Sequence, residues 1–258
     1  MRGTKWISGV VAVFLLAAAV AAQTTAPQRL RVEVVAVRQH DPEAFTQGLL
    51  LHNGLLYEST GLYGRSSIRA YDPVSGSLVR IETLPTALFG EGLAFGGDRL
   101  VQLTWREGVA LERDPKTLAE RTRRRYAGEG WGLAHDGKRF IMTDGSAQLF
   151  FRDTKTFDLL STLTVLRRGV PQDRLNELEW AEGQLFANVL GEENILRIDT
   201  ESGIVTAEID CSGLLAPGER ARADVLNGIA HDPATGHFLI TGKLWPKLFE
   251  VKFVPVSP

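Results

Sequence analysis

The feature that most constrains this chain is a repeat whose five copies share glycine and apolar residues but differ at one position. The copies cover residues 45–61, 89–105, 129–145, 175–190 and 226–243. When they are aligned on the Leu or Ile that opens each apolar stretch, one position, called the slot here, holds Gln47, Glu91, Trp131, Asn176 and Asn227. Successive slots are 44, 40, 45 and 51 residues apart, a period typical of propellers and solenoids. A position kept only for packing tends to hold one residue type, so these unlike slots indicate a site built from several repeats.

The segments between the slots predict short strands and turns, with almost no helical periodicity. A second feature, an aspartate at the start of a turn, recurs at Asp72, Asp114, Asp153 and Asp199 with a similar period. Short strands at such spacing predict an all-β fold, a five-bladed β-propeller. Apolar stretches at 31–37 and 248–253 lie outside the five repeats, and we expect them to share a blade and close the ring. The best helix candidates are 167–176 and 212–224.

The first 22 residues have the pattern of a secretory signal peptide. Arg2 and Lys5 precede an apolar stretch over 7–22, which ends in a small-residue cleavage site around Ala19 and Ala21. An uncleaved membrane anchor is the alternative, but the apolar stretch is short for that role. We therefore expect an exported protein, periplasmic or secreted, with no stable membrane anchor after cleavage. Residues 23–258 form a single catalytic propeller domain in this interpretation, and we expect a monomer.

Charge and cysteine content exclude several classes of function. The net charge of −2 provides no basic field for nucleic acid. The single cysteine, Cys211, forms no internal disulfide, and its strand context favours a packing role over that of a nucleophile. The five histidines lack the HxxxH or HxH spacing of a catalytic zinc site.

In a propeller, the slot residues would meet at one mouth of the central channel. A second equivalent set follows each slot by fourteen residues, or by sixteen in the fifth repeat, and consists of Gly61, Trp105, Gly145, Leu190 and Lys243. Because side chains at i and i+2 share a strand face, Phe45 accompanies Gln47 and Phe89 accompanies Glu91. The expected mouth is an apolar cup with few polar groups, as in small-molecule and chain-end sites.

The motifs at these positions resemble those of the glutaminyl cyclases of the papaya and bacterial type, which are five-bladed propellers. The matching segments are Phe45-Thr-Gln47-Gly-Leu, Phe89-Gly-Glu91-Gly-Leu, Leu103-Thr-Trp105, Gly130-Trp131-Gly-Leu, Asn176-Glu-Leu-Glu-Trp180, Phe186-Ala-Asn-Val189, Leu226-Asn-Gly-Ile229 and Thr241-Gly-Lys243-Leu-Trp-Pro-Lys247. Together they span residues 40–252 in order. The resemblance implies the activity of that family, a glutaminyl-peptide cyclotransferase activity that converts an N-terminal glutaminyl residue of a peptide into pyroglutamyl and releases ammonia.

That chemistry assigns a role to each mouth residue. Glu91 is the only acidic residue in either set, so we expect it to carry a proton from the attacking α-amine to the leaving nitrogen. Lys243 and Asn176 are the expected donors to the oxyanion, and Gln47 resembles the family residue that holds the substrate. Four aromatic rings would form the walls that exclude water, namely Phe45, Phe89, Trp105 and Trp131. Catalysis needs no cofactor in this scheme.

Two features keep other interpretations open. Leu190 stands where the family usually has a tryptophan, which widens the pocket and leaves a non-catalytic exported propeller that binds peptide N-termini as an alternative. Glu177 and Glu179 follow the slot residue Asn176 on alternate positions of the strand. If they point into the channel, their carboxylates are a candidate site for a structural Ca²⁺. A calcium-dependent lactonase or a lyase on the same fold would need more carboxylate and carboxamide ligands than the slots offer.

Overall fold

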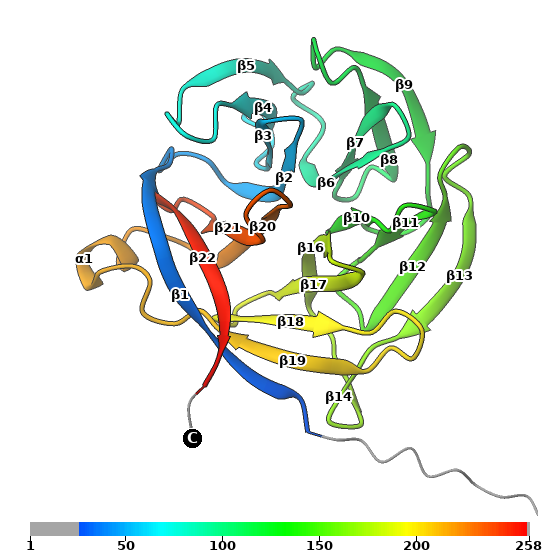
Figure 1. The fold of residues 1–258 in the computed structure, drawn as a ribbon. Helices are drawn as coiled ribbons and strands as arrows, with labels where there is room; N and C mark the ends of the chain where they lie inside the picture. Colours follow the sequence, from blue (N-terminus) through cyan, green and yellow to red (C-terminus); the bar gives the residue numbers. More distant parts are fainter. Residues whose placement is uncertain (1–25, 257–258) are drawn as a thin grey trace, which may run out of the picture.

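The computed structural model describes residues 26–256, and its strands form successive four-stranded sheets around a central channel (Figure 1). The first sheet contains β2 (Thr46–His52), β3 (Leu55–Thr60), β4 (Ser67–Tyr71) and β5 (Leu78–Thr83). The second contains β6 (Gly90–Gly96), β7 (Arg99–Thr104), β8 (Val109–Arg113) and β9 (Glu120–Arg125). The third contains β10 (Leu133–His135), β11 (Arg139–Met142), β12 (Gln148–Asp153) and β13 (Leu159–Thr164).

The last two sheets are joined through the N-terminal strand. The fourth contains β16 (Leu175–Ala181), β17 (Gln184–Val189), β18 (Asn194–Ile198) and β19 (Val205–Asp210). The fifth contains β20 (Leu226–Asp232), β21 (His237–Gly242), β22 (Lys247–Pro255) and β1 (Gln28–Gln39). β1 pairs antiparallel with β22 along most of its length, and its first residues pair parallel with β19. The expected all-β propeller closed by its terminal strands is therefore confirmed, with β1 as the outer strand of the last blade (Figure 1).

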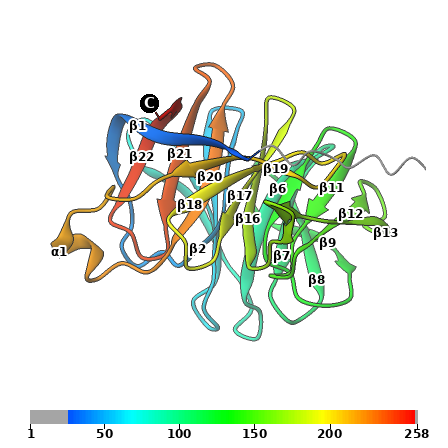
Figure 2. The same ribbon diagram turned by 90° about the horizontal axis from the view of Figure 1, so that it is seen from below.

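The inner strands β2, β6, β10, β16 and β20 contact one another around the centre of the ring. Figure 2 shows the same ring seen edge-on. The hydrogen-bond register shifts at the slot in four of them, between Thr46 and Gly48, Gly90 and Leu93, Leu175 and Leu178, and Leu226 and Ile229. Such a bulge changes the direction in which a side chain points, and bulges are common beside functional sites. The slot residues of these four strands therefore lie at bulges, which can direct their side chains toward one mouth.

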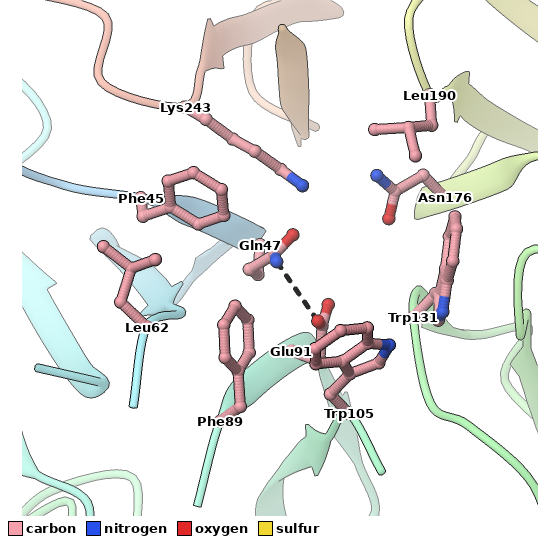
Figure 3. A pocket seen from close by; sticks show the side chains of 10 residues that line it. All are labelled: Phe45, Gln47, Leu62, Phe89, Glu91, Trp105, Trp131, Asn176, Leu190 and Lys243. Carbon is pink, nitrogen blue, oxygen red and sulfur yellow. Dashed lines mark hydrogen bonds between the residues drawn. The ribbon is translucent and has the colours of Figure 1, made fainter. Parts of the chain in front are cut away.

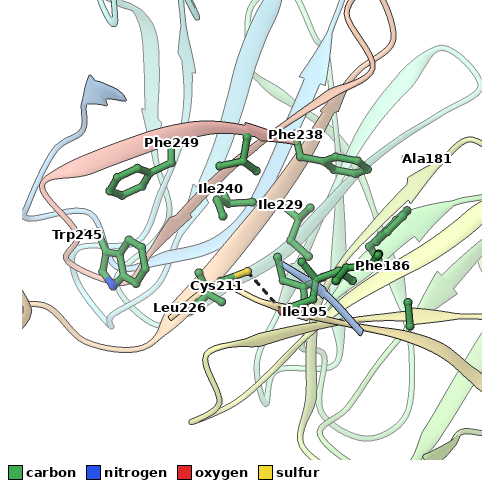
Figure 4. Close-up of a cluster of buried hydrophobic side chains, with 14 of the residues drawn as sticks. Ala181, Phe186, Ile195, Cys211, Leu226, Ile229, Phe238, Ile240, Trp245 and Phe249 are labelled. Carbon is green, nitrogen blue, oxygen red and sulfur yellow. Dashed lines mark hydrogen bonds between the residues drawn. The ribbon is translucent and has the colours of Figure 1, made fainter. Parts of the chain in front are cut away.

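The core lies between the blades. In one cluster, apolar residues of the fourth and fifth blades pack around Cys211, which is 1% exposed, and Trp245, which is 2% exposed (Figure 4). Burial raises the pKa of the Cys211 thiol, which keeps it protonated. Trp245 donates from Nε1 to the Asp224 carbonyl oxygen at 2.9 Å. Cys211 thus has the packing role that its strand context predicted.

The two helix candidates have different outcomes. In the segment 212–224, a short helix, α1 (Pro217–Arg220), begins with proline, which suits the first helical position. The prediction for 167–176 is wrong, because that segment holds most of the hairpin β14 (Leu166–Arg167) and β15 (Val170–Pro171). Arg168 and Gly169 both have positive φ, 54° and 81°, as a two-residue type I′ turn requires.

No helix between residues 26 and 256 has the length and apolar character needed to cross a membrane. The expected signal peptide over 1–22 lies outside the described residues.

Candidate active site

A cavity of about 260 Å³ lies at one mouth of the channel, and it is lined by all the residues to which the sequence assigned a catalytic or binding role (Figure 3). Its lining consists of Phe45, Gln47, Leu62, Phe89, Glu91, Trp105, Trp131, Asn176, Leu190 and Lys243. The side chains come from all five blades, although the sequence separates the first from the last by almost 200 residues. A cavity of this size can hold the side chain of one terminal residue but is small for a larger ligand.

Glycines that follow the slots allow the inner strands to approach one another. A Cβ at Gly48 would come within 2.7 Å of Leu93 N, and one at Gly92 would come within 2.5 Å of Leu133 N. The same holds at Gly132, where a Cβ would lie 2.0 Å from a backbone oxygen of the fourth blade. Larger residues at these positions would separate neighbouring blades. The repeated slot–glycine pattern therefore brings the slot side chains close to one another around the mouth.

Glu91 is the acidic group of the cavity and is 4% exposed. Its Oε1 accepts a hydrogen bond from Gln47 Nε2 at 3.1 Å (Figure 3). Burial raises the pKa of Glu91 well above its usual value, and the negative charges of Glu129 and Glu107 add to this, whereas the charge of Lys243 lowers it. A carboxylate whose pKa is raised takes up a proton more readily than an ordinary one and can then return it as an acid.

Lys243 enters the cavity from the turn that follows β21. It is 6% exposed, and its Nζ lies 4.9 Å from the centroid of the Phe45 ring. Burial lowers the pKa of the Lys243 ammonium, while the negative charge of Glu91 opposes that effect. Its backbone is held on both sides, because Lys243 N donates to Val225 O and Lys243 O accepts from Asp224 N, each at 2.9 Å.

Asn227, the fifth slot residue, lies behind Gln47 and is absent from the cavity lining. It is fully buried, and its Nδ2 donates to Thr46 O at 2.9 Å and to Gln47 Oε1 at 3.4 Å. Because Gln47 Oε1 faces this donor, its Nε2 is directed toward Glu91. The fifth slot therefore orients the first, and the sequence pattern did not predict this.

Asn176 faces Glu91 and Lys243 from the fourth blade (Figure 3). It is 2% exposed, and its backbone oxygen accepts a hydrogen bond from Thr143 Oγ1 at 2.8 Å. The same hydroxyl accepts Gly132 N at 2.7 Å, which ties the third blade to the fourth at the slot. The backbone is thus fixed, and the carboxamide of Asn176 points into the cavity.

Aromatic rings form the walls, and the glycines of the second set make room for them. The Phe89 ring lies 6.3 Å from that of Phe45 and 5.4 Å from that of Trp105, centroid to centroid. A Cβ at Gly61 would lie 2.2 Å from the Phe89 ring. Gly145 has a φ of 84°, and a Cβ there would lie 2.6 Å from the indole of Trp131. The five unlike residues of the second set therefore have distinct roles. Trp105 and Leu190 line the cavity as walls, the two glycines accommodate walls, and Lys243 brings its ammonium into the cavity.

Several residues at the mouth were not predicted. Leu62, which lines the cavity with a φ of 82°, follows a second-set glycine and has no equivalent in the repeat. Glu129 accepts hydrogen bonds from the indoles of Trp105 and Trp131, at 2.7 and 3.0 Å. Neither residue belongs to the two aligned sets, but Glu129 stands two residues before its slot, as Phe45 and Phe89 do, and that spacing was the signal that could have found it.

Glu177, on the inner strand of the fourth blade, is fully buried. Its Oε1 accepts Leu49 N at 3.2 Å and its Oε2 accepts Ile229 N at 2.9 Å, so it joins the fourth blade to the first and fifth. Burial raises the pKa of Glu177, and burial raises the pKa of Glu179 to about 8. Between residues 26 and 256, no three acidic, histidine or cysteine side chains gather as metal ligands would.

The fold is a propeller, and its cavity holds a buried carboxyl, a lysine and two carboxamides between aromatic side chains. Residues 8–253 match the family model for glutamine cyclotransferase. A glutaminyl-peptide cyclotransferase of Arabidopsis thaliana is 40% identical over 232 residues, which are 88% of this chain and 72% of that protein. The crystal structure of Myxococcus xanthus glutaminyl cyclase has a TM-score of 0.81 and 37% identity, over 90% of this chain and 100% of that one. The chain belongs to the glutamine cyclotransferase family.

Proposed function

We propose that the protein is a glutaminyl-peptide cyclotransferase that converts N-terminal glutaminyl residues of peptides to pyroglutamyl, with Glu91 as the proton shuttle and no metal in the reaction. The observation that carries this proposal is the placement of one buried carboxyl beside a lysine and two carboxamides in an aromatic cavity. Family membership and the two named relatives support the same reaction.

The reaction needs one proton to move between two nitrogens of the same residue. The α-amine attacks the carbon of the γ-carboxamide, a new C–N bond forms, and the attacking nitrogen becomes positively charged. Glu91 accepts a proton from that nitrogen and donates it to the γ-nitrogen, whose bond to carbon then breaks to release ammonia. The raised pKa of Glu91 suits the first step, because it makes the carboxylate a stronger base, and the protonated carboxyl is then the acid of the second step.

The γ-carbonyl oxygen gains negative charge in the tetrahedral intermediate. The ammonium of Lys243 and the amide of Asn176 point into the cavity and would donate to this oxygen (Figure 3). Such donors act strongly where water is excluded, and removing one typically costs about 10²–10³-fold in turnover. Gln47 is held by Asn227 beside Glu91, where it would orient the substrate's α-amine or backbone.

The rings of Phe45, Phe89, Trp105 and Trp131 supply the remaining requirement, which is the conformation of the substrate. Cyclisation joins two atoms of one residue, so a narrow apolar cavity that favours the folded side chain raises the fraction of reactive conformers. Because conformer selection, a proton shuttle and oxyanion donors suffice for the reaction, the proposal has no step for a metal ion. The structural Ca²⁺ expected near Glu177 and Glu179 stays a separate prediction, which metal analysis of the purified protein tests.

The proposed substrates are peptides or proteins with an unblocked N-terminal glutamine, met after export to the periplasm or the exterior. The test is mass spectrometry of peptides incubated with the protein. A Gln-Xaa peptide should lose one molecule of ammonia, whereas the same peptide with an acetylated α-amine should not react. If the wild-type protein binds the free peptide stoichiometrically without releasing ammonia, the proposal fails and the alternative of a binding propeller is supported.

A further inference from the structure

Glu129 lies at the rim of the cavity and contacts two of its walls at once. Its Oε2 accepts hydrogen bonds from Trp105 Nε1 at 2.7 Å and from Trp131 Nε1 at 3.0 Å. The two indoles belong to different blades, since Trp105 follows β7 and Trp131 precedes β10. One carboxylate oxygen therefore fixes the position of one wall relative to the other.

A cation completes this arrangement. Arg106 Nε donates to Glu129 Oε1 at 3.0 Å, and the Arg106 guanidinium stacks on the Trp105 ring, 3.7 Å from its centroid. Trp105 is thus held through its indole nitrogen and across one ring face. The contacts are charge-assisted, and such hydrogen bonds are roughly twice as strong as neutral ones. Although burial opposes it, the three donors hold the pKa of Glu129 below its usual value, so the carboxylate is ionised.

The loop that carries Glu129 is itself anchored. Gly130 N donates to Trp105 O at 2.8 Å, and the hydroxyl of Tyr126 hydrogen-bonds to Thr104 O. A Cβ at Gly130 would lie 2.2 Å from that hydroxyl, so the backbone passes close to it. The carboxylate therefore has a defined position relative to β7, and it is not free to follow the indoles if they move.

We infer that Glu129 is a positioning residue for the cyclisation, which holds the indoles of Trp105 and Trp131 at the spacing that folds the glutaminyl side chain for attack. This inference rests on the proposed function. Glu129 stands two residues before its slot, where two other blades have the wall residues Phe45 and Phe89, but it contacts the walls and is absent from the cavity lining. A misplacement of a positioning group by about 1 Å can cost about 10²-fold in rate.

Glu129 also acts on Glu91 through charge, and that effect must be separated from positioning. The charges that act on Glu91 are those of Lys243, Glu129 and Glu107. Glu107 is a matched control, because its charge also raises the pKa of Glu91 but it contacts no indole. It accepts hydrogen bonds from Tyr63 Oη at 2.7 Å and from Phe89 N at 3.5 Å. Removing either rim charge should lower the pKa of Glu91 and move the acid limb of the kcat/KM profile to lower pH.

The experiment compares Glu129→Ala, Glu129→Gln and Glu107→Gln. Ammonia release from a Gln-Xaa peptide is measured across pH, and acrylamide quenching of tryptophan emission reports on the indoles without requiring activity. We expect all three variants to shift the acid limb downward. Only Glu129→Ala should also lower the plateau of kcat/KM by about tenfold or more and increase quenching, whereas Glu129→Gln, which keeps an acceptor oxygen, should recover most of both.

The outcomes are distinguishable. If Glu129→Ala matches Glu107→Gln in plateau and in quenching, Glu129 acts only through its charge and the inference is overturned. If Glu129→Gln is as impaired as Glu129→Ala, the hydrogen bonds to the indoles do not carry the effect, and the inference is again overturned. A wild-type protein that releases no ammonia would refute the proposed function, while the quenching comparison would still test how Glu129 holds the indoles.

Discussion

Replacing Glu91 with glutamine removes the carboxyl that shuttles the proton while preserving the shape of the side chain. Gln47 Nε2 donates to Glu91 Oε1 at 3.1 Å, and the carbonyl oxygen of a glutamine can accept the same hydrogen bond. The substituted side chain has nearly the same volume, so the aromatic walls keep their positions. The variant therefore separates proton transfer from packing.

The expected loss of activity follows from the role of the carboxyl. General acid–base catalysis contributes about 10²–10⁴-fold, which corresponds to about 2.7–5.4 kcal/mol of transition-state stabilisation. We expect kcat for a Gln-Xaa peptide to fall within that range in Glu91→Gln. KM should change little, because the cavity keeps its size and its oxyanion donors. The assay is steady-state ammonia release at several peptide concentrations.

The stability of the same variant should move in the opposite direction. Because the pKa of Glu91 is raised in the folded state, the folded protein binds more protons than the unfolded chain above about pH 4.5. The Glu91 carboxyl therefore contributes stability at low pH, and this contribution is lost as the pH rises through the pKa of the folded state. The loss in the free energy of unfolding is about 1.4 kcal/mol for each unit by which the pKa is raised. Glutamine does not titrate, so the variant should melt higher than wild type at pH 8, by about 2–4 °C per kcal/mol, and equally near pH 4.

These two results together test the reasoning. A folded Glu91→Gln protein whose kcat stays within about threefold of wild type would refute the proton-shuttle role, because general acid–base catalysis contributes far more than that. A variant that melts lower than wild type at pH 8 would instead show that the buried carboxylate is stabilising, contrary to the burial and charge arguments given above.

Three further substitutions probe other parts of the site. Lys243→Leu should lower kcat by about 10²–10³-fold and move the acid limb of the profile to higher pH, since the charge of Lys243 lowers the pKa of Glu91; a limb that moves to lower pH would contradict this. Leu190→Trp should narrow the cavity and lower KM for a Gln-Xaa peptide, and kinetics identical to wild type would show that position 190 does not contact substrate. Near pH 4, where the raised pKa of Glu177 costs the fold little, Glu177→Gln should destabilise it by about 1–3 kcal/mol, because one of the two backbone amides loses its acceptor; calorimetry at that pH that shows an unchanged melting temperature would refute this.

Much of the site could be predicted from the sequence because the propeller repeats its geometry. An inner strand begins at nearly the same point in each blade, so residues at equivalent positions, such as Gln47 and Glu91, arrive at the same mouth. The second set follows from the same logic, since the second strand of each blade returns to that mouth and brings Trp105, Leu190 and Lys243 with it.

The orientation of individual side chains could not be predicted from that repeat. Asn227 occupies an equivalent position but turns toward the first blade, where Thr46 O offers it an acceptor. The register shifts at the slots break the simple alternation of strand faces, so spacing alone does not decide which way a side chain points. Glu129 was missed for a different reason: it stands two residues before its slot, as Phe45 and Phe89 do, but its contacts with two indoles of different blades are not encoded in the repeat.

The segment 167–176 shows where local pattern was insufficient. Its apolar residues permit a short helix, but Arg168 and Gly169 turn the chain back on itself after two residues. Leu166 N then donates to Gly203 O at 2.8 Å, a contact between distant parts of the chain that no local pattern contains. Tertiary contacts thus decided the structure of this segment.

The measurement that tests the central claim most directly is ammonia release from a Gln-Xaa peptide by wild-type protein that has been freed of metals with EDTA. The account predicts that the metal-free protein turns over at the rate of the untreated protein, because Glu91, Lys243 and Asn176 supply the chemistry. Loss of turnover in EDTA, followed by its return on addition of a divalent cation to folded protein, would contradict the account.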